Sequence, residues 1–413
     1  MIAMTLAEIA GLVDGVLTGA ADAVVTGTVT LDSRTVRPGD LFVAFPGERV
    51  DGHDFLGAAA AAGAVAALGS RPDDALPVVV VGDQVAALGR LAAGVHERLT
   101  GSGLTGSGLR TVGITGSSGK TSTKDLLGQV LAAAGPTVSP PGSYNNDIGL
   151  PLTVLSADQD TRFLVLEMGS RGPGHIARLC AVARPQVGVV LNVGSAHLGE
   201  FGSPEGIAAA KGELVEALAA EGTAVLNADD PRVLGMAPRT RARVLTTGTG
   251  PAADVRATGI SLDDAARPRF TLAAAGEEHP VALRVVGAHQ VANALSVAGA
   301  ALAVGMNPAD VAAALSVAEP RSRWRMEVAR RDDGVTVVNT LPGLLHSAEG
   351  ATRVGHGHGG VTGTMPKPAL GRMTVRVAWR EPQLFEGNNH QQVRRHHICR
   401  PDRPPAGRRA RRL

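Results

Sequence analysis

The chain has 413 residues, with 40 Lys and Arg against 38 Asp and Glu, and a formal net charge of +2. A composition of 44% hydrophobic and 19% charged residues is typical of a soluble globular protein and excludes a wholly disordered one. The balanced charge gives no reason to expect a nucleic acid or an anionic membrane as a partner. This length predicts two to four domains. Because aromatic residues are only 2%, the cores must be built mainly from Val, Leu, Ile and Ala.

Cysteine usage and hydropathy indicate where the protein works. Cys180 and Cys399 are not in a metal-binding spacing, which predicts a reducing, cytoplasmic setting. The first residues lack the basic region of a signal peptide. The longest apolar run, GAAAAAGAVAALG at 57–69, is too short to cross a bilayer, and we interpret it as a buried helix. We therefore expect a cytoplasmic protein without membrane insertion, and a monomer.

Residues 1–100 alternate short strand and helix patterns and predict an N-terminal domain. Residues 27–45 predict a strand, a loop, a turn and a second strand, with Pro38-Gly39 suited to the middle of a type II turn. The apolar run at 76–83 predicts a strand buried on both faces. The Gly/Ser stretch at 101–110 then predicts a linker.

From 111 to 320 a strand pattern is followed repeatedly by a helix pattern. Strands are predicted within 161–169, 185–194 and 222–230, and helices within 203–218 and 289–305. This alternation predicts an α/β fold with a mostly parallel sheet and helices on both faces. Ligands gather at the carboxyl ends of the strands in such sheets. Four polar residues follow predicted strands there: Glu167, Asn192, His197 and Asp229.

The pattern changes after Asn339. From Leu341 to the end there are 12 Arg and one Lys against three Glu and one Asp, a net charge of +9. Residues 321–413 therefore predict an incomplete domain with a basic, disordered tail. One interpretation is a tail that meets an anionic partner. The interpretation that we favour is a segment that is not a working domain, such as a frame change in a GC-rich gene would produce.

A possible phosphate-binding loop lies in the stretch TVGITGSSGKTSTKDLLGQVL, which starts at 111. The usual pattern needs a glycine at the position of Ile114, so the match is one residue short. Gly116 and Gly119 would let backbone N–H groups turn inward, and the helix that follows would present its N-terminus to an anion. Lys120 would supply a charge and Thr121 a hydroxyl for Mg²⁺. The alternative is a glycine-rich turn with a solvated lysine.

This loop resembles the ATP loop of the Mur ligases, which build the peptide stem of bacterial peptidoglycan and use this shortened form. The stretches that share the resemblance include DSRTVRPGDLFVAFPGERVDGHDF, YNNDIGLPLTVL, LEMGSRGPGHI, LNVGSAHLGEFGS, AAAKGEL, GAHQVANALSVAGA and RWRMEV, in order from about residue 5 to 339. The resemblance implies an N-terminal domain for UDP-muramoyl peptide and a central ATP domain at 111–320. It implies ATP-dependent addition of D-alanyl-D-alanine to UDP-N-acetylmuramoyl-tripeptide through an acyl phosphate.

The resemblance also assigns residues to roles. For ATP it implies Gly116, Ser117, Ser118, Gly119, Lys120, Thr121 and Ser122, with His289, Asn293 and Arg325. For two Mg²⁺ ions it implies Thr121, Glu167, His197 and Lys211, with Lys211 carbamylated by CO₂ because a cationic lysine would repel the metal. Lys120, Lys211 and His197 would be catalytic. For the UDP-muramoyl peptide it implies Ser33, Arg34, His53, Asn145, Asn146 and Thr153.

Structural alternatives stay open for these residues. Glu167 could cap a helix, His197 could be a satisfied structural histidine, Lys211 a solvated helix residue, Asn145 and Asn146 an ordinary turn, and Arg325 part of a salt bridge. In the family the sequence after VVN continues as D-A-Y-N-A-N-P into a third domain, whereas Thr340 follows Asn339 here. Two alternatives to the ligase therefore remain: a truncated remnant that only binds nucleotide or UDP-muramoyl peptide, and another Mur-type amide ligase.

Overall fold

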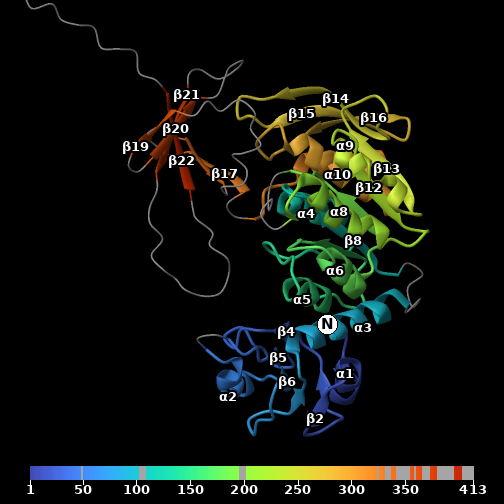
Figure 1. The fold of residues 1–413 in the computed structure, drawn as a ribbon, viewed down its shortest axis with the longest axis vertical. Coiled ribbons are helices and arrows are strands. Elements are labelled where there is room, and N and C mark those ends of the chain that lie inside the picture. The colour runs from blue at the N-terminus through green and yellow to red at the C-terminus, as the bar shows by residue number, and fades with distance from the viewer. Residues whose placement is uncertain are drawn as a thin grey trace, which may run out of the picture.

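The computed structural model describes residues 1–47, 50–101, 108–194 and 201–322, together with the backbone of strands between 325 and 401. Figure 1 shows a small N-terminal α/β unit at one end of the molecule and a larger sheet beyond it. Of the helices in the described residues, none combines the length and hydropathy that crossing a bilayer requires.

The N-terminal unit is built on a five-stranded sheet in the order β2-β7-β6-β5-β4, in which only β2 is antiparallel to its neighbour. Its elements are β1 (Met4–Thr5), α1 (Leu6–Val13), β2 (Val16–Thr18), β3 (Val24–Val25), β4 (Val29–Thr30), β5 (Leu41–Val43), a 3₁₀ turn (Gly52–Phe55), α2 (Leu56–Ala61), β6 (Ala66–Gly69), β7 (Val78–Val80) and α3 (Gln84–Gly101). The predicted type II turn is confirmed, because Asp40 N donates to Arg37 O at 3.1 Å and Gly39 has φ +94°.

The helix predicted across 57–69 is wrong in its second half. Helix α2 ends at Ala61, and Gly63 adopts φ +99°, which ends the helix at little cost because glycine has no Cβ. The remaining apolar residues form β6, which is fully buried between β5 and β7. Alanine favours helices locally, but burial between two parallel strands decides the structure here.

The central sheet has nine strands in the order β16-β15-β14-β13-β12-β11-β8-β10-β9. Among the described strands of this sheet, β8 to β14 pair in parallel with their neighbours in this order. Strands β15 and β16 add an antiparallel edge. The strands are β8 (Arg110–Thr115), β9 (Thr137–Val138), β10 (Phe163–Glu167), β11 (Val187–Val190), β12 (Thr223–Asn227), β13 (Arg243–Gly248), β14 (Val255–Leu262), β15 (Pro268–Ala274) and β16 (Glu277–Ala282). The helices and 3₁₀ turn between these strands are α4 (Lys120–Ala132), α5 (Gly149–Leu155), α6 (His175–Ala183), α8 (Pro204–Glu216), α9 (Pro231–Leu234) and η2 (Ala237–Arg239). Helices α10 (Gln290–Ala303) and α11 (Pro308–Val317) follow β16.

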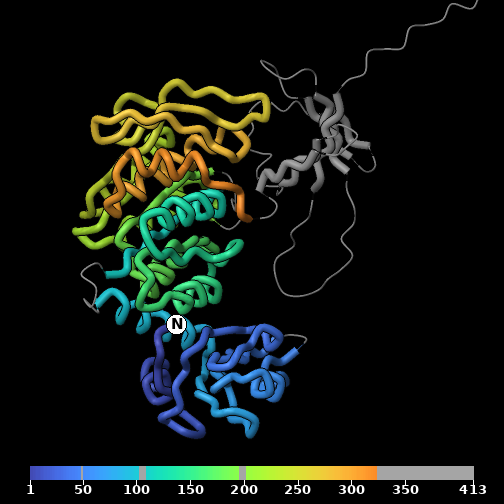
Figure 2. The backbone as a smooth tube through the Cα atoms, turned by 180° about the vertical axis from the view of Figure 1, so that it is seen from behind, coloured from blue at the N-terminus to red at the C-terminus, as the bar shows by residue number. Residues whose placement is uncertain are grey.

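Strand β10 shows why this sheet needs helices on both faces. Its residues are all apolar until Glu167, and alternate side chains point to opposite faces. Leu164 and Leu166 belong to the core beneath α5, α6 and α8, whereas Phe163 and Val165 belong to the core beneath α4, α10 and α11. Figure 2 shows α10 and α11, in orange, in front of the second face. The predicted α/β architecture is therefore confirmed.

Helix α3 joins the two units. It packs on α5 and α6 of the central unit, and α1 packs on it from the N-terminal side. The His96 Nε2 lies 2.8 Å from the hydroxyl of Thr111, at the start of the central sheet. Burial lowers the pKa of His96 to about 4, so the imidazole is neutral. Residues 102–107 of the predicted linker lie outside the described residues, and the domain boundaries stay predictions.

Beyond residue 322 the structure describes only the backbone of six antiparallel strands, in the order β17-β18-β22-β21-β20-β19. They are β17 (Arg325–Arg330), β18 (Thr336–Thr340), β19 (Val354–Gly357), β20 (Gly360–Thr364), β21 (Met373–Ala378) and β22 (Arg395–Pro401). This sheet is separate from the central one. Apart from the backbone of these strands, the incomplete domain and basic tail predicted at 321–413 lie, from 323 onward, outside the described residues.

Candidate active site

The Gly/Ser loop sits at the carboxyl end of the central strand. Strand β8 continues through the buried Ile114 to Thr115, so Ile114 belongs to the strand and the loop is the short segment before α4. Gly119 is the N-cap of α4 with φ +83° and no side-chain cap, so the helix N-terminus is left to attract an anion. The Lys120 Nζ donates to Gly116 O at 2.7 Å, which places its charge along the loop. Ser122 follows in the first turn of α4.

Asn192, two residues after β11, shapes the loop from the neighbouring strand. Its Oδ1 accepts from Ser118 N at 3.0 Å, and its Nδ2 donates to Ser118 O at 3.2 Å. Its backbone O accepts from Ser117 N at 3.1 Å, and Ser117 Oγ accepts from Gly194 N at 2.9 Å. The sequence placed Asn192 at a strand end, and these bonds show that it orders two loop residues.

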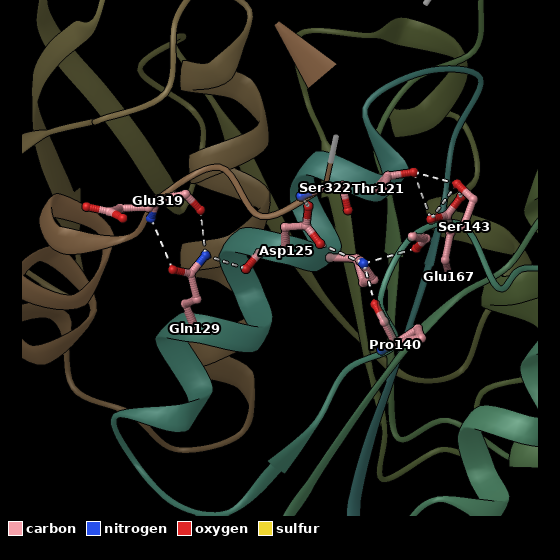
Figure 3. A network of polar contacts seen from close by, with 10 residues as sticks. Thr121, Asp125, Gln129, Pro140, Ser143, Glu167, Glu319 and Ser322 are labelled. Atoms are coloured by element: carbon pink, nitrogen blue, oxygen red, sulfur yellow. Dashed lines mark hydrogen bonds and ion pairs between the residues drawn. The ribbon is translucent and has the colours of Figure 1, made fainter. Parts of the chain in front are cut away.

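Glu167 lies beside the loop, as the last residue of β10, and is only 1% exposed. The Thr121 hydroxyl donates to its Oε2 at 2.9 Å, and the Asn145 Nδ2 donates to its Oε1 at 2.8 Å. The Ser143 Oγ lies 2.8 Å from Thr121 Oγ1 and 3.4 Å from both carboxylate oxygens. Figure 3 shows the three side chains of Thr121, Ser143 and Glu167 turned toward one another.

These oxygen atoms fit a magnesium ion that also binds phosphate. Among the described residues no three His, Cys, Asp or Glu side chains gather as a metal cluster. Mg²⁺ does not need such a cluster, because it usually binds one or two carboxylates together with substrate phosphates and waters. One buried carboxylate beside a hydroxyl at the mouth of a phosphate loop provides that donor set, and it would suit a hard cation rather than a soft one.

Lys211 is buried in α8, close enough to Lys120 for the two charges to interact. Burial, and then the charge of Lys120, lowers the pKa of Lys211 to about 7. Helix α8 can pack close to the sheet because two strand residues are glycines. A Cβ on Gly113 would lie 3.2 Å from Leu214, and one on Gly188 would lie 3.1 Å from it. The interpretation of Lys211 as a solvated helix residue is therefore wrong.

Helix α10 brings a second predicted residue to the loop. Asn293 is buried, and its Oδ1 would lie 2.6 Å from a Cβ built on Gly119, so the amide touches the loop. Its Nδ2 donates to Gln290 Oε1 at 2.9 Å. His289 is the N-cap of α10, one residue before the helix, and burial lowers the pKa of its imidazole. His197 and the side chain of Arg325 lie outside the described residues.

Two predicted substrate residues have local structural bonds. Asn146 Oδ1 accepts from Gly149 N at 2.8 Å and Ile148 N at 3.2 Å, as in an ordinary Asx turn that leads into α5. The Thr153 hydroxyl is buried and donates to Gly149 O of its own helix at 2.9 Å. Their predicted contacts with the peptide substrate stay predictions.

The predicted UDP-sugar residues lie in the N-terminal unit. Ser33 is in the turn after β4, and Arg34 beside it is 87% exposed and pairs with Asp32 at 2.6 Å, which lowers the Asp32 pKa to about 2. His53 is buried: Ser70 N donates to its Nε2 at 2.9 Å, and its Nδ1 therefore donates to Asp51 at 2.6 Å. Among the described contacts, none joins these three residues to the phosphate loop at 116–119.

Sequence reasoning missed Ser143 and Lys124. Ser143 lies two residues before Asn145, and this closeness to a predicted site residue could have indicated it. Lys124 is wholly buried although lysine normally lies at the surface, and its only signal was its position among core residues of α4.

Comparison with known families agrees with this geometry. The family model of the Mur ligase middle domain matches residues 114–301, and the model described as Mur ligase family, catalytic domain, matches 26–94. The chain is 49% identical to the UDP-N-acetylmuramoyl-tripeptide–D-alanyl-D-alanine ligase of Mycobacterium tuberculosis (strain ATCC 25618 / H37Rv), over 82% of this chain and 70% of that protein. It is 38% identical to the ligase of the same name from Escherichia coli (strain K12), over 74% and 66%.

Solved structures agree as well. Crystal structure I of MurF from Acinetobacter baumannii superposes with a TM-score of 0.72 at 30% identity, over 80% of this chain and 71% of that one. The MurF ligase from Thermotoga maritima in complex with ADP gives a TM-score of 0.64 at 31% identity, over 75% and 69%. On this similarity in sequence and in structure, the chain belongs to the Mur ligase family, with the UDP-N-acetylmuramoyl-tripeptide–D-alanyl-D-alanine ligases.

Proposed function

We propose that this chain is an ATP-dependent amide ligase that joins D-alanyl-D-alanine to the terminal carboxylate of UDP-N-acetylmuramoyl-tripeptide. The observation that carries the proposal is the meeting of the phosphate loop with the buried carboxylate of Glu167, through Thr121, at the carboxyl ends of neighbouring strands. The relatives named above carry this activity in their names, and a structure with ADP is among the superposable ones.

The chemistry explains why ATP is needed. A carboxylate is a poor acyl donor because its oxygen leaves badly, and transfer of the γ-phosphoryl group to it gives an acyl phosphate. The amine of D-alanyl-D-alanine then attacks the acyl carbon, and phosphate leaves as the amide forms. The protein's contribution in such transfers is positioning and charge stabilisation. Lys120 and the N-terminus of α4 would hold the phosphates, while Asn293 of α10, which lies against Gly119, would contact the nucleotide.

Magnesium would be held by Glu167 and Thr121, with His197 and carbamylated Lys211 for a second ion. When bound, it neutralises phosphate charge in the transition state. Lys211 suits carbamylation because its lowered pKa leaves much of it as the neutral amine that attacks CO₂. With isotope-labelled bicarbonate we expect a carbamate carbon signal in the NMR spectrum of the chain and none in Lys211→Met. A signal of equal intensity in both would assign the carbamate elsewhere.

The direct test is release of ADP from ATP in the presence of UDP-N-acetylmuramoyl-tripeptide. We expect release to depend on both the tripeptide and the dipeptide, because the acyl phosphate forms only on the first and turns over only with the second. A related amide ligase that acts on folate or builds a polyamide would use a different acceptor. ADP release that ignores the UDP-muramoyl substrate would contradict the proposal.

A second candidate function is nucleotide or UDP-muramoyl-peptide binding with little ligation. The observation in its favour is the sequence after Asn339, which departs from the family's D-A-Y-N-A-N-P. In the same assay it predicts measurable ADP binding without dipeptide-dependent turnover. The cytoplasmic location and the monomeric state stay predictions from the sequence.

A further inference from the structure

Lys124 is a lysine whose side chain is only 1% exposed, one helical turn after Lys120. An ammonium group has three N–H donors and no acceptor. Lys124 Nζ has three acceptors around it: Pro140 O at 2.5 Å, Gly142 O at 3.0 Å and Asp125 Oδ1 at 2.6 Å. The number of acceptors matches the number of donors, so a charged lysine is fully satisfied here. Loss of one partner from such a buried ion pair is strongly destabilising, because the other charge is left uncompensated.

Two of these acceptors belong to the loop between β9 and α5, and other residues of that loop donate hydrogen bonds to Glu167. One residue after Gly142, the Ser143 hydroxyl reaches Thr121 and Glu167, and two residues further Asn145 donates to Glu167. Asn145 is also fixed from the far side, because Gly169 N donates to its carbonyl at 2.9 Å. The Lys124 ammonium therefore anchors the near end of the segment that orients the carboxylate.

Asp125 extends the same contacts in the other direction. Its Oδ2 accepts from Ser322 N at 2.9 Å, in the segment that follows α11. One turn later on α4, Gln129 Nε2 donates to Glu319 O at 2.8 Å, and Gln129 Oε1 accepts from Glu319 N at 3.1 Å. Figure 3 shows the contacts as one series, from Glu319 through α4 to Glu167. Helix α4 thus carries the phosphate loop at its start and connects residues 319–322 with the Glu167 carboxylate.

We propose that Lys124 is a positioning residue: its ammonium fixes the 140–145 loop on α4, so that Ser143 and Asn145 present the Glu167 carboxylate to magnesium beside the phosphates. The inference rests on the proposed function, in which Glu167 and Thr121 hold the ion. Lys124 itself touches neither the carboxylate nor the loop at 116–119 in the contacts described. Its effect is therefore on the metal-dependent part of nucleotide binding, as partners behind metal ligands usually act.

The test measures ADP binding to the whole 413-residue chain by calorimetry, once with Mg²⁺ and once with a chelator, and the melting temperature of each variant. Lys124→Met keeps an apolar stem of similar length and removes all three donors. Leu127→Ala is the matched control, because it lies buried on the same helix in an apolar core. Ser143→Ala removes the next link without disturbing the buried lysine.

We expect both helix variants to lower the melting temperature. Only Lys124→Met should also reduce, by about tenfold or more, the gain in ADP affinity that Mg²⁺ gives to the unmodified chain. Ser143→Ala should reduce the same gain with little change in melting temperature. Binding in the chelator should be equal in all variants.

The inference is overturned if Lys124→Met keeps the full Mg²⁺ gain and behaves like Leu127→Ala. If Lys124→Met gives no folded protein, Ser143→Ala decides, and an unchanged Mg²⁺ gain in that variant overturns the inference. An unmodified chain whose ADP binding ignores Mg²⁺ would remove the proposed function together with the inference, so the two failures are distinguishable.

Discussion

Lys120→Ala is expected to lower ATP-dependent ADP release about a thousandfold, because loss of one preorganised charge at a transferring phosphoryl group has an effect of that order. The Lys120 Nζ bonds Gly116 O within its own loop, and loss of that hydrogen bond should cost the fold about 1 kcal/mol. The measurement is ADP release with both substrates present, beside a thermal melt of the same sample.

The control for this prediction is a second cation outside the loop. Arg98 lies on α3 and pairs with Glu8 at 3.0 Å on the surface, so Arg98→Ala removes a charge without touching the phosphates. We expect it to leave ADP release unchanged. Near-normal turnover in Lys120→Ala would exclude the loop from the mechanism, and the proposed function with it.

Gly119→Ala is expected to weaken nucleotide binding strongly, because the new methyl group makes a close contact and not because a charge is lost. The residue has φ +83°, and a Cβ there would lie 2.6 Å from Asn293 Oδ1, well inside contact distance. The Asn293 amide or the loop must then shift at the place where the phosphates would bind. We expect ADP affinity to fall about a hundredfold, a loss of about 2.7 kcal/mol in binding free energy, measured by calorimetry.

Gly305→Ala is the matched control for backbone strain. Gly305 also has a positive φ, +98°, but a Cβ there would meet nothing within 4 Å. Both variants should lose about 1 kcal/mol of folding free energy, the usual cost of a left-handed alanine, and only Gly119→Ala should lose ADP binding. Equal binding by the two variants would show that the close approach of Asn293 is unimportant.

Much of the fold could be predicted because a buried strand needs apolar residues, and these are visible in the sequence. Strand β10 is apolar from Phe163 to Leu166 and then changes to Glu167, so both its length and its polar end are visible in the sequence. Ile114, an apolar residue where the usual loop pattern has a glycine, lies within β8, which ends one residue later at Thr115. Periodicity failed at 57–69, where the alanines favour a helix although the second half is a buried strand, and only Gly63 marks the boundary.

The site was harder to predict because its partners are assembled by tertiary contacts. Glu167 and Thr121 are 46 residues apart and meet only after β10 has paired with β8. No local rule places the Ser143 hydroxyl beside Thr121 and Glu167. None predicts that the charged side chain of Lys124 is buried together with the apolar residues of α4. The resemblance to a family supplied roles for Lys211 and Asn293, but burial and contact distances show how each is held.

Gly113 of β8 and Gly188 of β11 determine how closely α8 packs against the central sheet. Leu214 of α8 packs against both glycines, where a Cβ would be too close to it. The position of α8, and of Lys211 on it, therefore depends on glycine at both places. Alanine at either position would bring a Cβ within 3.2 Å of Leu214, so Leu214, its neighbours or α8 itself would have to shift by a few tenths of an ångström. A change at these two apolar positions could therefore act on Lys211 without replacing any polar residue of the site.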